Sequence, residues 1–266
     1  MPATDRLDPA LIAAALEDRA SRFALDIRAA CDSTNSELRD HPPVDDGRIH
    51  VLACEVQSEG RGRRGRRWVA PPGAGLTFSL LWRFDAGAPV PGGLSLVAGL
   101  AVARCLERLG VEGVQLKWPN DVLVLGRKIA GILVELVPGR GRTPAAVVGI
   151  GINVQAPDRS ELPPGVEACG LAEALGDAPG RNALLAATLR EFEALFDVYA
   201  AAGFAAFRQA WLQRNAHAGL PVVITGEAQE LAGTCVGVDD DGALLLATEH
   251  GERRVLAGEV SLRPLA

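Results

Sequence analysis

The sequence predicts an α+β fold, with a large mixed domain over residues 1–218 followed by a small β-module over residues 219–266. Two patterns carry this prediction. In the first part of the chain, strand-like runs of Val, Ile and Leu alternate with longer apolar runs at helical spacing. After Gly219-Leu220-Pro221, short β-rich runs alternate with turns, which is typical of a small β-barrel. At 266 residues the chain is long enough for a large domain and a small one.

The composition is that of a globular protein: 48% of residues are hydrophobic, 23% are charged and the net charge is −6. No apolar run approaches the length that spans a bilayer, and the N-terminus lacks the pattern of a signal peptide. The five cysteines are scattered without a CxxC pair, which predicts reduced thiols and no zinc site. The acidic balance argues against general nucleic-acid binding. We therefore expect a cytoplasmic protein with no metal site of its own, no nucleic-acid partner and no membrane association.

Two features open the large domain. Asp8-Pro9 predicts the start of a helix, because Asp is a favoured N-cap and Pro suits the first turn. Further on, Ser33-Thr34-Asn35-Ser36-Glu37 is a cluster of short polar side chains. Thr34 with Glu37 fits a capping box that opens a short helix. The same cluster could offer N–H groups and hydroxyls to a polar ligand, and both interpretations stay open here.

An arginine-rich loop lies between two predicted strands, Ile49–Gln57 and Leu76–Phe84. The loop, Gly60–Trp68, holds three glycines and five arginines: Arg61, Arg63, Arg64, Arg66 and Arg67. Glycine lets a backbone approach a ligand closely, arginine supplies paired donors for phosphate or carboxylate, and Trp68 offers a flat surface for stacking. A basic RNA-binding arm is the alternative. The short span between two apolar strands favours a loop that closes over a small anion.

Lysine occurs only at Lys117 and Lys128 among 27 basic residues. Unlike arginine, lysine is a compact point charge on a flexible stem. Trp118-Pro119-Asn120-Asp121 predicts a turn, and Gly126-Arg127-Lys128 a hairpin between strands over 122–125 and 129–137. Two cations and the Asp121 carboxylate near a tight turn suit phosphate or carboxylate chemistry. The plainer alternative is a solvated hairpin tip.

Around this hairpin, Gly93–Leu109 predicts an almost wholly apolar helix packed on the sheet, and Pro138–Thr143 predicts a polar turn. The next strand, Ala145–Val154, is interrupted by Gly149 and Gly151, and glycine within a strand often marks a place where a ligand lies against the backbone. Asn153 at its end is either a reader of a base edge or an ordinary strand-end turn residue.

The rest of the large domain is an irregular connection over Gln155–Pro179 and a helix over Asn182–Ala200. The aromatic residues of this helix and those that follow it at helical spacing are interpreted as core. The C-terminal module is expected to contain four strands: Val222–Ile224, Thr234–Val238, Ala243–Thr248 and Arg253–Leu256. Its eight acids and three bases argue against a nucleic-acid reader.

Taken in order, GRGRRGRRW, KWPND, GRK followed by IAGILVE, and GIGIN resemble the biotin protein ligase family. The upstream Ser-Thr-Asn cluster and the downstream GEVSLR match too, so the resemblance runs from about Cys31 to Arg263. It implies a catalytic domain with a class II synthetase-like mixed sheet and a C-terminal SH3-like barrel. Bifunctional members carry an N-terminal winged-helix DNA-binding domain. Only one helix is predicted before Cys31, so the resemblance implies a ligase without the repressor role.

The family's chemistry is then expected of this chain. The biotin carboxylate attacks the α-phosphate of Mg-ATP, which releases pyrophosphate and leaves biotinyl-5′-AMP. A lysine of a biotin carboxyl carrier domain next attacks the mixed anhydride and releases AMP. Mg²⁺ is expected to be held mainly by ATP oxygens. The implied partner is the carrier domain of a biotin-dependent carboxylase, and we expect a monomer or a weak homodimer.

Site residues follow from the same resemblance. The biotin ring is expected to bind at Ser33, Thr34, Asn35 and Gln57. The loop residues that are expected to surround biotin and the phosphate are Gly60, Arg61, Gly62 and Arg63. The valeryl tail is expected to lie along Gly131, Leu133, Gly149 and Gly151. The nucleotide side is expected to include Arg61, Arg63, Arg64, Arg66, Trp68, Lys117, Asn120, Asn153 and Arg263.

For catalysis we expect Lys128 at the carboxylate and α-phosphate oxygens, with Arg61 and Arg63 as clamps and Lys117 near the phosphates, because two anions must be brought together. Asp121 is the candidate that assists deprotonation of the acceptor lysine. Three rivals stay open: a lipoate-protein ligase, a non-catalytic biotin-responsive DNA-binding regulator, and a nucleic-acid-binding module that uses the arginine loop alone.

Overall fold

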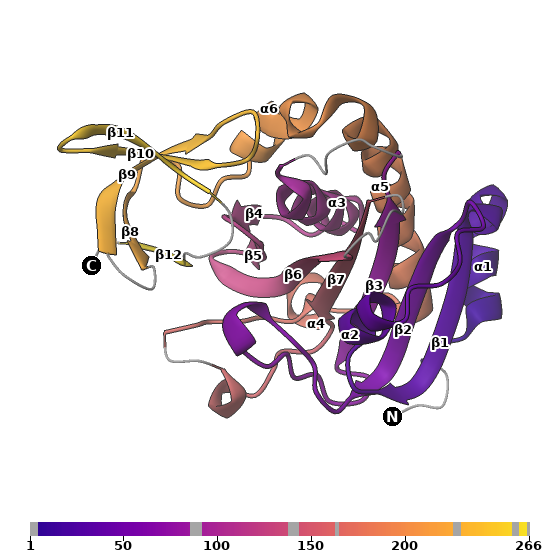
Figure 1. Cartoon of the computed structure of the whole chain (residues 1–266). Helices are drawn as coiled ribbons and strands as arrows, with labels where there is room; N and C mark the ends of the chain where they lie inside the picture. The colour runs from indigo at the N-terminus through magenta and orange to yellow at the C-terminus, as the bar shows by residue number, and fades with distance from the viewer. Residues whose placement is uncertain are drawn as a thin grey trace.

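The structure is a computed structural model that describes residues 5–85, 92–137, 144–162, 165–225, 230–256 and 261–264. Within these ranges the strands form two sheets (Figure 1). The large sheet has seven strands in the order β1-β2-β3-β7-β6-β5-β4, and the small one has five in the order β11-β10-β9-β8-β12. The α+β class is therefore confirmed. The predicted turn over Pro138–Thr143 lies outside the described residues.

The large sheet consists of β1 (Phe23–Cys31), β2 (Ile49–Gln57), β3 (Gly75–Arg83), β4 (Val114–Lys117), β5 (Asp121–Val124), β6 (Arg127–Val137) and β7 (Ala145–Asn153). All neighbours are antiparallel except β1 and β2, which run parallel. The strand predictions over β2, β3, β6 and β7 are confirmed within a residue or two at each end. Two strands, β1 and β4, were not predicted.

The helices of the large domain are α1 (Pro9–Leu16), α2 (Thr34–Asp40), α3 (Leu94–Arg108), α4 (Leu171–Leu175), α5 (Arg181–Ala202) and α6 (Arg208–Leu212). Asp8 caps α1 as predicted, accepting from the backbone N–H groups of Ala10 and Leu11. The N-cap of α2 is Ser33, however, so the predicted capping box of Thr34 with Glu37 is wrong by one position. Glu37 instead forms an ion pair with Arg28.

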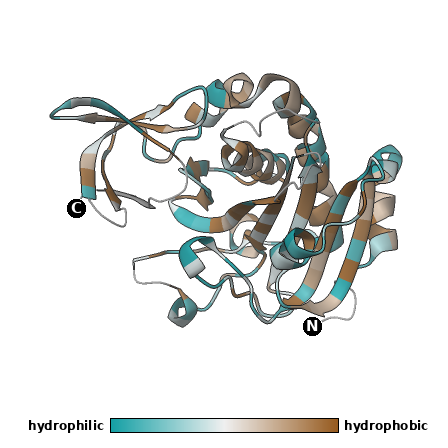
Figure 2. Cartoon of the chain, viewed as in Figure 1, coloured by the Kyte–Doolittle hydropathy of each residue, from teal (hydrophilic) through white to brown (hydrophobic). Residues whose placement is uncertain are grey.

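The two faces of the large sheet are covered differently. Helices α1, α3 and α5 pack on one face and form the main core with the apolar side chains of the strands, and Figure 2 shows hydrophobic residues concentrated there. On the opposite face, α2 packs through Leu38 on Leu52, Leu81 and Val147. Because one short helix covers only part of this face, the rest of it remains open for a site. None of the helices in the described ranges has the length and apolar character needed to cross a bilayer.

The C-terminal module is formed by β8 (Pro221–Thr225), β9 (Glu230–Val238), β10 (Leu244–Thr248), β11 (Gly251–Val255) and β12 (Ser261–Pro264). The four predicted strands are present, and β12, which pairs with β8, was not predicted. The module is joined to the large domain through side chains: Nε1 of Trp118 donates to the carbonyl oxygen of Gly242 at 3.1 Å. Backbone hydrogen bonds also link Leu116 to Arg214 and Ala216, just before the module begins.

The hairpin between β5 and β6 turns at Leu125-Gly126, both with positive φ. The predicted hairpin is thus confirmed, but Leu125 lies in the turn instead of the strand. Lys128 is the second residue of β6, and Lys117 and Asp121 face each other as a pair where β4 and β5 meet. Trp118-Pro119 is a cis peptide bond within the connecting turn.

Candidate active site

Small residues line the open part of the sheet face. Side chains on one face of a strand recur every second residue, so Thr77 and Ser79 share a face with Leu81 on β3, and Gly149 and Gly151 share it with Val147 on β7. The register places Ser79 and Leu133 on either side of Gly149, and Thr77 and Gly131 on either side of Gly151. Where α2 covers the sheet the positions are large and apolar, and beyond it they are small. This change in side-chain size leaves a hollow above the strands, part of which is taken up by Asn35 over Gly149 and by the Trp68 ring over Gly151.

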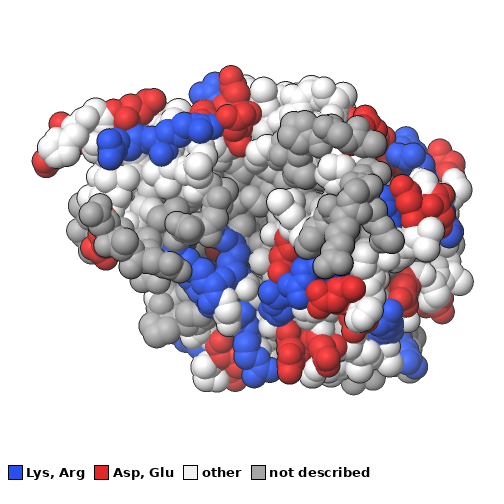
Figure 3. Space-filling view, viewed as in Figure 1, with Lys and Arg blue, Asp and Glu red and all other residues white. Residues whose placement is uncertain are grey.

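The hollow is a cavity of about 620 Å³. It is lined by every residue that the sequence analysis assigned to the site, with the exception of Gly60 and Arg263. Figure 3 shows Lys and Arg side chains on both sides of a hollow in the middle of this face. Lys117, Asp121 and Lys128 are among the lining residues, which favours a site over a solvated hairpin tip.

The two exceptions have different causes. Gly60 lies at the neck of the arginine loop, where an added Cβ would come within 2.2 Å of the carbonyl oxygen of Trp68. Its contribution is therefore to close the loop. Arg263 belongs to β12 and its backbone pairs with Val223, but its side chain lies outside what the structure describes.

One end of the cavity is a buried network of polar side chains. The backbone N–H and Oγ1 of Thr34 donate to Oε1 of Gln57 at 2.8 and 3.2 Å. Oγ1 of Thr34 also lies 2.7 Å from Oγ of Ser79, which in turn donates to Oδ1 of Asn35 at 2.7 Å. Since buried polar groups are costly unless paired, this network fixes the orientation of donors and acceptors at that end. Ser79 was not predicted as a site residue.

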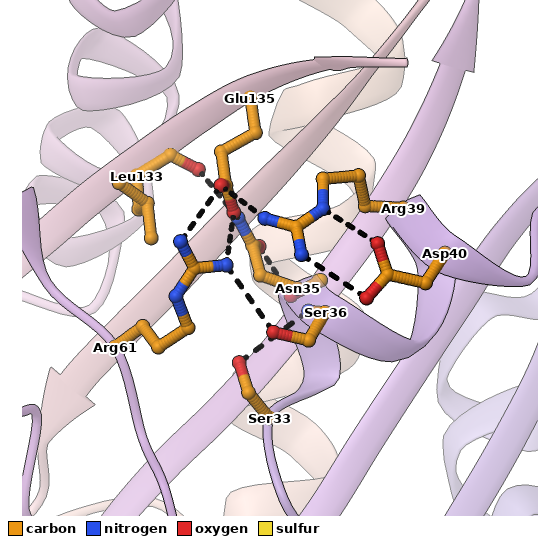
Figure 4. Close-up of polar contacts among 9 residues, drawn as sticks. Ser33, Asn35, Ser36, Arg39, Asp40, Arg61, Leu133 and Glu135 are labelled. Atoms are coloured by element: carbon orange, nitrogen blue, oxygen red, sulfur yellow. Dashed lines mark hydrogen bonds and ion pairs between the residues drawn. The ribbon is translucent and has the colours of Figure 1, made fainter. Parts of the chain in front are cut away.

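Glu135 connects this network to the arginine loop (Figure 4). Its carboxylate accepts from Nδ2 of Asn35 at 2.8 Å, from Arg39 at 2.7 Å and from Arg61 at 3.1 Å. Burial alone would raise the pKa of Glu135, but the Asn35 hydrogen bond and the charges of Arg61 and Arg39 outweigh it and lower the pKa. The predicted clamp Arg61 is therefore held by Glu135 in this structure. Sequence reasoning missed Glu135, although it follows Gly131 and Leu133 on the same face of β6.

Lys128, the central cation predicted for catalysis, lies in the cavity wall against Asp121 and Trp68. Nζ of Lys128 lies 2.6 Å from Oδ1 of Asp121 and 5.6 Å from the centre of the Trp68 ring. The backbones of Lys117 and Asp121 lie opposite each other in the β4–β5 register. The two residues assigned to different chemical steps, Lys128 and Asp121, are thus an ion pair. A substitution at either one is expected to affect the other.

The arginine loop is a compact turn that folds back on itself. The N–H of Gly62 donates to the carbonyl of Arg66, and the N–H of Trp68 to that of Gly60, at 2.7 and 2.9 Å. Arg63 points inward, where Nη1 donates to Oδ1 of Asn120 at 3.2 Å. Burial, followed by the charge of Arg64, lowers the pKa of Arg63. An anion that enters the cavity would relieve this crowding of like charges.

Two amide side chains support the backbone around Lys128. Nδ2 of Asn153 donates to the carbonyl oxygens of Lys128 and Cys169 at 3.3 and 3.2 Å. Nδ2 of Asn120 donates to the carbonyl of Ile132 at 2.8 Å. These contacts agree with the structural interpretation of Asn153, and its role toward the nucleotide stays a prediction.

Gly149 provides a test of the polar end of the cavity, which is the network of Thr34, Asn35, Gln57 and Ser79. An added Cβ would lie 2.2 Å from Oδ1 of Asn35, which is held by Ser79 and Glu135 and cannot move away freely. If this end holds biotin, as the resemblance implies, Gly149→Ala should weaken biotin binding by about 10-fold or more, because one lost or misplaced polar contact changes affinity by that order. Isothermal titration with biotin measures this. Gly99→Ala in α3 is the control, since its methyl would meet Leu116 at an ordinary 3.5 Å; equal biotin affinity in both variants would contradict the placement of Asn35.

Comparison with known proteins agrees with the geometry. Residues 30–153 match the profile of the biotin/lipoate A/B protein ligase family, and residues 217–263 match the biotin protein ligase C terminal domain. The bifunctional ligase/repressor BirA of Escherichia coli is 38% identical over 238 residues, which cover 87% of this chain and 72% of that protein. The biotin–acetyl-CoA-carboxylase ligase of Paracoccus denitrificans is 39% identical over 239 residues, covering 87% and 98%.

A solved structure is also similar. The biotin protein ligase from Aquifex aeolicus, in complex with biotin and ATP, superposes with a TM-score of 0.76 at 31% sequence identity and covers 91% of this chain and 99% of that one. The identity and coverage of these relatives, together with the two matched domains, establish that the chain belongs to the biotin protein ligase family.

Proposed function

We propose that the protein is an ATP-dependent ligase that forms biotinyl-5′-AMP from biotin and ATP and then transfers biotin to a lysine of a biotin carboxyl carrier domain. One observation supports this most: a single cavity joins a polar end, a glycine floor and a group of cations around Lys128. A ring with N–H and carbonyl groups fits the polar end, an apolar chain fits over glycine, and a carboxylate and a phosphate fit beside the cations.

The residue roles follow from this order along the cavity. Thr34, Asn35 and Gln57 bind the ureido ring, and the tail runs from there toward Lys128 past Leu133 and Gly131. Arg61 leaves Glu135 when an anionic ligand arrives, and with Arg63 it clamps the phosphate. Carboxylate and phosphate repel each other, so fixed positive charge where they meet lowers the barrier to adenylation. The acyl-adenylate would hydrolyse in open water, so the loop closes over it.

The residues present fit a Mg²⁺ ion that arrives with ATP. In the described ranges no group of three His, Cys, Asp or Glu side chains is arranged to hold a metal. Mg²⁺ commonly binds through substrate phosphates and waters with few protein ligands. Asp121, Glu161 and Glu167 line the cavity and are the carboxylates within it that could face such an ion. Bound in this way, the ion would neutralise phosphate charge.

We place the domain boundary between residues 218 and 219, and the acceptor at the open side of the cavity near Asp121. The cysteines are free thiols, and four of the five are buried, which supports action in the reducing cytoplasm. A monomer or weak homodimer, without nucleic acid, remains our expectation.

Incubation with biotin, ATP, Mg²⁺ and a purified carrier domain tests the function directly. Mass spectrometry of the carrier should show one added biotin on one lysine, dependent on ATP. A carrier in which that lysine is replaced by arginine is the control and should stay unmodified. An unmodified wild-type carrier would refute transfer.

The lipoate alternative is tested by the same assay with lipoate in place of biotin. Lipoate has no ureido group, so it would cover the polar network of Thr34, Asn35 and Gln57 with an apolar ring and form no hydrogen bonds with it. Sites built to hydrogen-bond a group discriminate strongly against analogues that lack it. We expect biotin to be preferred by at least about 10³-fold in kcat/KM. Comparable rates with both acids would contradict the assignment of the polar end.

Closure of the arginine loop is expected to protect it from trypsin. Arg61, Arg64, Arg66 and Arg67 are exposed in the free protein, and trypsin cleaves after arginine. With biotinyl-AMP bound, the loop should be cut at least about 10-fold more slowly, because ligand contacts order it. Cleavage at the exposed Arg253 and Arg254 of β11 is the internal control and should not change. Equal loss of both cleavages would indicate general stabilisation instead of loop closure.

A further inference from the structure

His217 is a buried residue of the cavity that the account above leaves without a role. It lies between α6 and β8, where the chain leaves the large domain, and it lines the same cavity as Lys117. Its residue is 6% exposed. In the part of the chain that the structure describes, Nδ1 of His217 is buried and has no hydrogen-bond partner. Buried polar atoms without a partner are uncommon in native proteins and call for an explanation.

The position of His217 is fixed by the backbone. The N–H of Leu116 donates to the carbonyl of Arg214, and the N–H of Ala216 donates back to the carbonyl of Leu116 at 2.9 Å. The N–H of His217 itself donates to Oδ1 of Asn215 at 3.1 Å. These bonds hold His217 beside Lys117, the last residue of β4. These bonds fix the backbone of His217 in the cavity wall, but they do not fix the orientation of its ring.

Burial, followed by the charge of Lys117, lowers the pKa of His217 to about 4. At neutral pH the ring is therefore uncharged and carries one N–H donor and one acceptor nitrogen. With so low a pKa it is a poor base, so general-base catalysis is not its role. An uncharged imidazole beside lysine can instead donate a hydrogen bond to an anion that the lysine attracts.

We propose that His217 is a further nucleotide-binding residue, which donates a hydrogen bond to the polyphosphate of ATP at the Lys117 end of the cavity. The inference rests on the proposed function in one respect: the anion that enters is taken to be ATP. Nδ1 is buried in the free protein, so the ring turns to present it to the ligand, which then supplies the missing partner. Biotin, bound at the opposite end near Thr34, does not touch His217. A substitution of His217 should therefore weaken ATP binding and leave biotin binding unchanged.

Three substitutions test this by isothermal titration with a non-hydrolysable ATP analogue. His217→Ala removes the donor and should weaken binding of the analogue by roughly 10- to 100-fold, the range expected for a lost hydrogen bond to a charged group. His217→Asn places an amide near the position of Nδ1 and should restore most of the affinity, whereas His217→Gln, which reaches toward Nε2, reports whether the other ring nitrogen is the donor. His250→Ala, an exposed histidine of the C-terminal module, is the matched control.

Biotin affinity is measured on the same proteins and should stay within about twofold, since loss of one ATP contact leaves the polar end intact. NMR of the ring protons adds a second measurement, and only four histidines need to be assigned. Bound polyphosphate favours the charged imidazole, so the pKa of His217 should rise when the analogue binds.

The proposal is overturned if His217→Ala binds the analogue as tightly as the wild type. It is also overturned if that variant loses ATP and biotin affinity alike, or if the pKa of His217 does not move. A wild-type protein that binds the analogue but makes no biotinyl-AMP would refute the proposed ligase function and leave the comparison of His217 variants valid.

Discussion

Lys128→Arg should slow biotinyl-AMP formation by roughly 10²–10³-fold, even though the positive charge is kept. In the structure Nζ of Lys128 sits 2.6 Å from Asp121 and over the Trp68 ring. A guanidinium is planar and wider than an ammonium, and Nζ is already the atom nearest to the Cβ position of Gly131, at 3.1 Å. Arginine at this position cannot place one donor at the point where carboxylate and phosphate meet.

Pyrophosphate release in a single turnover, without acceptor, measures this effect. The matched control is Arg127→Lys, which replaces arginine by lysine instead of lysine by arginine. Arg127 is the neighbouring residue, and it pairs with Glu173 outside the cavity. Arg127→Lys should keep the wild-type rate. An unchanged rate in Lys128→Arg would remove Lys128 from the adenylation step.

Asp121→Asn is expected to slow the transfer step by roughly 10²-fold and adenylation much less. The acceptor lysine must lose a proton before it attacks, and a free lysine has a pKa of about 10.4. The Asp121 carboxylate can receive or orient that proton, and an amide cannot. Its pairing with Lys128 adds a second consequence: without the carboxylate, the charge of Lys128 is no longer partly neutralised, so adenylation is spared.

The two steps are separated by supplying biotinyl-AMP to measure transfer alone. Glu173→Gln is the control, because Glu173 is a carboxylate that pairs with Arg127 outside the cavity. It should affect neither step strongly. If Asp121→Asn slowed both steps to the same extent, Asp121 would act only through its ion pair with Lys128.

The elements predicted correctly from the sequence are those with a clear hydrophobic or turn pattern of their own. The apolar helix α3, the β5–β6 hairpin and the glycine-interrupted strand β7 follow from such patterns. Strand β1 was missed because charged residues such as Asp26 and Arg28 interrupt its pattern, and its partner β2 pairs with it in parallel across a helix. Strand β4 is only four residues long.

Most residues of the site were predicted from motifs. The contacts between their side chains were not predicted. Sequence alone placed Arg61 and Lys128 in one region, since both belong to motifs of one family. It could not show that Arg61 pairs with Glu135, because that contact depends on how β6 packs against the loop. Nor could it show that Lys128 pairs with Asp121, because that contact depends on the irregular register of β5 and β6. His217 was missed for the same reason, since a lone histidine between two elements carries no local signal.

The central claim is that fixed positive charges around Lys128 bring the biotin carboxylate and the α-phosphate of ATP together. The most direct test is to incubate the purified protein with biotin, ATP and Mg²⁺, without acceptor, and to quantify bound biotinyl-5′-AMP by mass spectrometry after rapid quenching. The account predicts close to one adenylate per protein molecule, with release of an equal amount of pyrophosphate. Absence of both products from a folded protein that binds biotin and ATP would contradict it.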